Sequence, residues 1–119
     1  MQQDHLAVID RSALHALEAV LGAERMKSFI GEYLVQAQRL DSDLRRAWSR
    51  HDWEATYRPA HNLVSNAGNF GAQKVAALAD AIQHAAREHD EAALEAALEP
   101  LSEALIEAAK ELKRLYPQD

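Results

Sequence analysis

One histidine in this sequence stands among side chains that would leave its imidazole open to another molecule. Tyr57 and Arg58 precede His61 by one helical turn, the spacing at which side chains on a helix touch. The small residues Ser65 and Gly68 follow it by one and two turns. Near neutral pH an imidazole keeps one unprotonated ring nitrogen, so it can act as a nucleophile. This pattern suggests a histidine that another protein can approach.

These spacings matter only if the segment is a helix, and residues 52–70 predict one. Side chains suited to a core recur every three or four residues and define one buried face, made of Trp53, Thr56, Ala60, Leu63, Ala67 and Phe70. Asp52 is suited to cap the start of this helix, because its carboxylate can accept hydrogen bonds from free backbone amides. His61 lies roughly 130° from the middle of the buried face at about 100° per residue, so we expect it to be exposed.

The rest of the chain predicts four more helices. The first follows Asp10 and ends at Gly22, a long one covers residues 23–50, another covers 75–89, and the last carries a leucine seam over 94–115 that continues through Pro100. The 24 Ala and 15 Leu residues favour helices and outnumber the ten β-branched residues that favour strands. Because the connections are short, we expect an all-α fold: an antiparallel up-down four-helix bundle with a short extra N-terminal helix.

Composition excludes several classes of protein. The chain has 13 Lys and Arg against 19 Asp and Glu, a net charge of −6, which disfavours binding to nucleic acid phosphates. No apolar run is long enough to span a membrane, and no basic cluster followed by an apolar stretch opens the sequence. There is no cysteine. We expect a single cytoplasmic domain over residues 1–119 that binds neither nucleic acid nor membranes.

Residues 60–72 carry the most distinctive pattern, AHNLVSNAGNFGA. It pairs Ala-His-x-Leu with Gly-Asn-x-Gly-Ala, and the second group begins seven residues after the histidine. This resembles the signature of histidine-containing phosphotransfer (HPt) domains, in which AHxLKG precedes GNxGA at this spacing. The chain is also similar to that family in length, in its predicted helices and in having the histidine on the third helix.

The resemblance implies that His61 accepts a phosphoryl group from the aspartyl phosphate of a response-regulator receiver domain and passes it to another receiver. The implied partners are receiver domains, with a hybrid histidine kinase as a further candidate. In this family the Mg²⁺ and the acidic pocket belong to the receiver. The resemblance therefore implies a monomeric phosphohistidine carrier, without a cofactor or metal site of its own, rather than an autonomous enzyme.

Two positions depart from the family signature. Val64 and Ser65 stand where family members carry lysine and glycine. The resemblance gives that lysine the role of offsetting phosphoryl charge, so its loss removes a cation. Arg58, on the face of His61, is one candidate to replace it through its fork of donors, and Ser65 could donate a hydrogen bond to phosphate. Each is as readily an ordinary solvated side chain.

Two other functions are open. A degenerate module would bind a receiver or kinase without efficient transfer, although its retained histidine favours transfer; Tyr57, Val64 and Gly68 are the candidate docking residues. An enzyme is disfavoured, because the sequence has no cysteine nucleophile and no glycine-rich phosphate loop. His84 and Glu88 are spaced as metal ligands can be, but no third ligand is evident.

Overall fold

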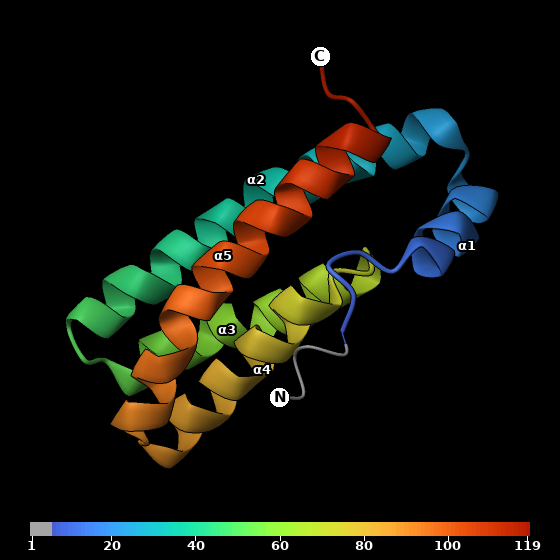
Figure 1. The fold of residues 1–119 in the computed structure, drawn as a ribbon. Helices are drawn as coiled ribbons and strands as arrows, with labels where there is room; N and C mark the ends of the chain where they lie inside the picture. The colour runs from blue at the N-terminus through green and yellow to red at the C-terminus, as the bar shows by residue number, and fades with distance from the viewer. Residues whose placement is uncertain (1–5) are drawn as a thin grey trace.

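Residues 6–119, which the computed structural model describes, form five helices and no strand (Figure 1). The helices are α1 (Arg11–Leu21), α2 (Ala23–Ser49), α3 (Trp53–Asn69), α4 (Gln73–Glu88) and α5 (Glu91–Leu115). The predicted all-α fold is confirmed. No helix in this part of the chain is long and apolar enough to cross a lipid bilayer.

Short polar residues begin three helices. Asp10, Asp52 and Asp90 each accept a hydrogen bond from a backbone amide in the first turn of α1, α3 and α5. Left-handed residues turn the corners after α2 and α4, where His51 and His89 have φ angles of 54° and 56°. These local signals explain why the predicted helix boundaries agree closely with the observed ones.

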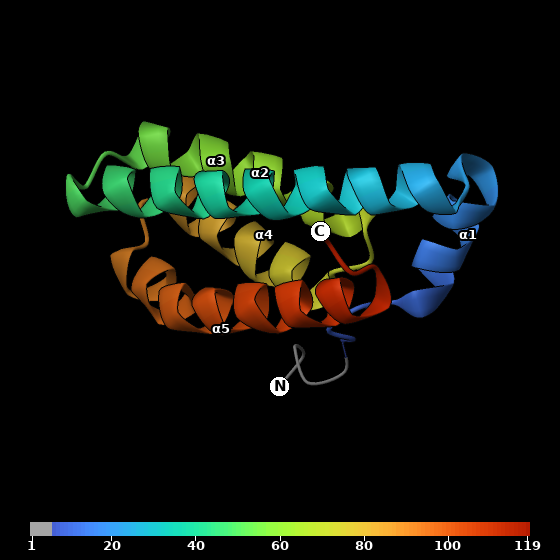
Figure 2. The same ribbon diagram turned by 90° about the horizontal axis from the view of Figure 1, so that it is seen from above.

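Consecutive helices pack on one another along the chain. α2 contacts α3, α3 contacts α4, and α4 contacts α5, while α1 lies against α2 at one end of the molecule (Figure 2). Large apolar side chains from these helices meet in one core, including the fully buried Leu14, Met26, Ile30, Leu44, Leu63, Ile82, Leu94, Leu101 and Leu112. Their burial fixes which face of each helix remains in contact with solvent.

Pro59 and Pro100 lie inside α3 and α5, and each helix continues past its proline. The predicted continuation through Pro100 is therefore confirmed. Arg45 of α2 braces α5 beside this proline by donating to the Leu98 carbonyl oxygen at 2.7 Å and to Ser102 Oγ at 2.6 Å. These bonds join α2 to α5, two helices whose backbones come close to each other at only a few positions.

The turn between α3 and α4 holds the segment that leads into α1. Gly71 has a φ angle of +74°, and its carbonyl oxygen accepts a hydrogen bond from the Asp10 amide at 2.8 Å. A Cβ atom at Gly71 would lie 2.8 Å from the Asp10 carbonyl oxygen. Glycine is therefore required here by both the backbone conformation and the close approach of another segment.

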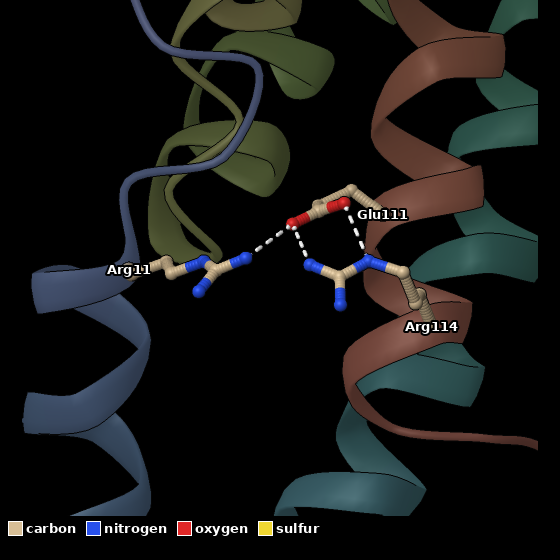
Figure 3. Close-up of polar contacts among 3 residues, drawn as sticks. All are labelled: Arg11, Glu111 and Arg114. Carbon is tan, nitrogen blue, oxygen red and sulfur yellow. Dashed lines mark hydrogen bonds and ion pairs between the residues drawn. The ribbon is translucent and has the colours of Figure 1, made fainter.

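A charged cluster ties α1 to α5 (Figure 3). Glu111 accepts from Arg114 at 2.6 Å and from Arg11 at 3.0 Å. The hydrogen bonds from Arg114 and Arg11 lower the pKa of Glu111 to about 2. The cluster thus links residues 100 positions apart in the sequence.

Candidate functional site

His61 lies on α3 with its side chain exposed, as the helical period predicts. On the opposite side of this helix, Ala60, Leu63 and Ala67 are fully buried. The core contacts hold α3 in one rotation about its axis, so they fix the direction in which His61 points. The imidazole is therefore presented to solvent by a well-packed helix.

One nitrogen of the His61 ring is engaged by the neighbouring helix. Nδ1 of His61 lies 2.9 Å from Oε1 of Gln83, which is on α4. An amide oxygen can only accept a hydrogen bond, so this contact requires a proton on Nδ1. In the neutral ring, the lone pair then belongs to Nε2, the nitrogen available for attack.

A tyrosine and an arginine complete the surroundings of the histidine. The ring of Tyr57 stacks on that of His61, with centroids 5.6 Å apart and planes inclined by 13°. Arg87 of α4 donates to the Tyr57 hydroxyl, and its guanidinium carbon lies 4.9 Å from the centre of the Tyr57 ring. A shallow hollow of about 240 Å³ is lined by Tyr57, His61, Gln83, His84 and Arg87. A positive charge therefore lies beside His61, on α4.

Within residues 6–119, Arg58 and Ser65, the predicted neighbours of a phosphoryl group on α3, make no hydrogen bond to His61. Arg58 is exposed and forms an ion pair with Glu54, with a nitrogen to oxygen distance of 3.6 Å. Ser65 is exposed. Among the described residues neither side chain hydrogen-bonds to His61 in this structure, so the contacts seen around the imidazole come from Tyr57 and Gln83.

The three predicted docking residues differ in how open they are. Tyr57 and Val64 are half-buried and pack against the core. Gly68 is exposed, and a Cβ atom built there meets no atom within 4 Å. Gly68 is therefore the most open of the three.

Gln83 and Arg87 were missed at the sequence level, because their polar spacing on α4 looks like that of any solvated helix face. They reach His61 and Tyr57 only because α3 and α4 pack side by side. Their separation of four residues, on the helix that follows the histidine, was the available signal. His84, considered above as a metal ligand, instead points Nδ1 at the Asp80 carbonyl oxygen, 2.9 Å away.

Within the described residues, one group of three side chains has ligand atoms close enough to share a cation. His51, Glu91 and Glu95 are exposed, and these atoms lie within 4.8 Å of one another. They stand near the start of α3, and His61 is about 12 Å further along that helix axis at 1.5 Å per residue. This group is therefore separate from the histidine site.

Comparisons with known proteins concern the family and the fold of this chain. A family model described as Hpt domain matches residues 28–115. Among solved structures, the chain is similar to histidine-containing phosphotransfer protein B (HptB) from Pseudomonas aeruginosa PAO1, with a TM-score of 0.86, 18% sequence identity, and coverage of 91% of this chain and 93% of that one. No curated protein sequence matches the chain. At 18% identity, this structural similarity is evidence for the fold alone.

Proposed function

Because this chain belongs to the Hpt domain family and has a phosphotransfer role in two-component signalling, we propose that it is a phosphorelay intermediate that carries the phosphoryl group on His61. It accepts this group from the aspartyl phosphate of one receiver domain and donates it to another. A hybrid histidine kinase is a further candidate partner. The observation that carries the proposal is an exposed imidazole whose Nδ1 is held by Gln83, so that Nε2 is free.

The chemistry follows from this arrangement. The Nε2 lone pair attacks phosphorus, a nitrogen–phosphorus bond forms, and the bond between phosphorus and the aspartate oxygen breaks to release the carboxylate. The proton stays on Nδ1, so the ring gains positive charge, which the Gln83 oxygen stabilises through its hydrogen bond. Return of the phosphoryl group to a receiver aspartate is the reverse reaction. The Mg²⁺ that assists these steps is expected on the receiver.

Arg87 is our first candidate for the cation that offsets the phosphoryl charge, since it lines the same hollow as His61. A charge-assisted hydrogen bond contributes about 1.5–3 kcal/mol, so we expect Arg87→Ala to slow phosphorylation about 10- to 100-fold. Arg58 is the second candidate, because its exposed side chain lies one turn before His61 on the same helix face. Comparing Arg58→Ala with Arg87→Ala decides between them.

We also infer the finer architecture and setting. Successive helices pack on one another across connections of a few residues, which supports an antiparallel up-down four-helix bundle with α1 as an extra helix. The single core supports one domain over residues 1–119. We expect this domain to act as a monomer in the cytoplasm, where receiver domains operate.

The test uses the full chain, a panel of phosphorylated receiver domains, and three proteins: the wild type, His61→Ala and the control His15→Ala, which changes an exposed histidine on α1 outside the hollow at His61. We expect acid-labile, base-stable phosphate on the wild type and on His15→Ala but not on His61→Ala. Label that persists in His61→Ala would contradict the assignment. If the wild type binds a receiver and stays unlabelled, the chain is instead a docking module, consistent with Val64 in place of the family's lysine.

A further inference from the structure

A carboxylate on α4 lies behind the glutamine that holds His61. Asp80 Oδ1 accepts a hydrogen bond from Gln83 Nε2 at 2.6 Å, one turn away on the same helix. Gln83 in turn meets His61 Nδ1 at 2.9 Å through its other amide atom, Oε1. The three side chains therefore form a continuous chain of hydrogen bonds from the Asp80 carboxylate to the His61 imidazole.

This chain of hydrogen bonds has one direction, because the Asp80 carboxylate at its end can only accept hydrogen bonds. The two ends of a glutamine amide have nearly the same shape, one donating and the other accepting. A carboxylate only accepts, so Asp80 selects the NH₂ end of Gln83 and turns the oxygen toward His61. With the amide reversed, Gln83 would place its oxygen against the Asp80 carboxylate and present a donor to Nδ1.

We propose that Asp80 is a positioning residue that fixes the orientation of the Gln83 amide and thereby holds His61 in the tautomer protonated on Nδ1. The choice of Nε2 as the nucleophile is then set two side chains away from the reacting atom. This consequence for catalysis rests on the proposed function. The tautomer itself is a property of the unphosphorylated protein and can be measured without any partner.

The other polar side chains near Asp80 and Gln83 do not orient the Gln83 amide. His84 approaches the same carboxylate, with Nδ1 3.4 Å from Asp80 Oδ1, but its Nδ1 lies closer to the Asp80 carbonyl oxygen, at 2.9 Å. Arg87 is engaged with Tyr57. His84→Ala is therefore a matched control, since it removes a neighbour of Asp80 and leaves the bond from Gln83 to Asp80 in place.

The experiment measures the ring ¹⁵N chemical shifts of His61 by NMR in the intact, unphosphorylated chain at a pH where the ring is neutral. We expect the wild type and His84→Ala to be protonated mainly on Nδ1. Asp80→Ala should populate both tautomers, because its Gln83 amide can reverse, and Gln83→Leu should lose the preference as well. Asp80→Asn can still accept through its amide oxygen, so we expect it to restore part of the preference.

The inference is overturned if the wild-type ring is protonated mainly on Nε2, or if Asp80→Ala keeps the wild-type tautomer. Asp80 is partly exposed, with 48% of its side chain accessible, so its removal should leave the fold intact, and the amide spectrum of each variant checks this. If phosphorylation proceeds through Nε2, Asp80→Ala should also slow it about two- to tenfold, in proportion to the competent tautomer. Should His61 prove unable to accept phosphate, the tautomer result would still stand or fall on its own.

Discussion

Substituting Gly71 by alanine tests the close packing between the α3–α4 turn and the segment before α1. Gly71 has a φ angle of +74° and is buried, and its carbonyl oxygen binds the Asp10 amide at 2.8 Å. A Cβ atom would lie 2.8 Å from the Asp10 carbonyl oxygen and 3.2 Å from its nitrogen. Both of these neighbours belong to the backbone, so they cannot move aside as a flexible side chain would.

The expected loss combines two effects. A non-glycine residue in the left-handed region costs about 1–2 kcal/mol, and displacing Asp10 weakens a backbone hydrogen bond worth about 0.5–1.5 kcal/mol. We therefore expect Gly71→Ala to lower the free energy of unfolding by about 1.5–3.5 kcal/mol. For a domain of this size, about 1 kcal/mol corresponds to about 4 °C in Tm, so the shift should be about 6–14 °C downward.

The assay is thermal unfolding followed by circular dichroism, with Gly68→Ala as the matched control. Gly68 belongs to the same motif, but a Cβ atom there has no neighbour within 4 Å, so alanine should leave stability unchanged or raise it by up to about 1 kcal/mol. Gly71→Asn separates the two effects, because asparagine tolerates a positive φ angle but still carries Cβ. A Gly71→Ala protein that melts within about 2 °C of the wild type would refute the reasoning, since even the lower end of the summed cost, about 1.5 kcal/mol, predicts a shift of about 6 °C.

Three further outcomes follow from the structure. Arg114 and Arg11 lower the pKa of Glu111 from 4.5 to about 2, so the ionised carboxylate stabilises the fold above pH 4.5, and this contribution is lost as the pH falls toward 2. When melting is measured at a series of pH values, the Tm difference between the wild type and Glu111→Gln should therefore shrink over that range. Leu63→Ala should cost about 2–5 kcal/mol in urea unfolding, because this fully buried side chain leaves a cavity beneath the histidine helix. Asp10→Ala should cost about 0.5–2 kcal/mol in the same assay, since its carboxylate caps α1, and an unchanged midpoint would show that the cap is dispensable.

Two helices, α3 and α4, supply the side chains around His61. α3 presents the imidazole, and its buried face fixes where the ring points. α4 contributes the side chains that act on the ring and its neighbour, with Gln83 on Nδ1 and Arg87 on Tyr57. The hydrogen-bond partner of the ring therefore comes from a different helix than the one that carries His61.

The sequence by itself determined the five helices, their approximate ends and the exposure of His61. These are local properties: the helical period decides which residues share a face, and capping residues such as Asp52 and Asp90 act within one turn. The pattern in residues 60–72 was also sufficient to indicate the family, which the match over residues 28–115 confirms. Each of these conclusions depends on residues only a few positions apart in the chain.

Only the tertiary structure decided which side chains meet the histidine. Gln83 contacts His61 across 22 positions, and Arg87 reaches Tyr57 across 30, because α3 and α4 pack together. The sequence offered Arg58 as one candidate cation because it shares a helix face with His61, but it could not show that Arg87 of α4 lines the same hollow as His61. The reason is physical: spacing within one helix fixes which residues share a face, but the rotation and offset between packed helices depend on how the whole core fills.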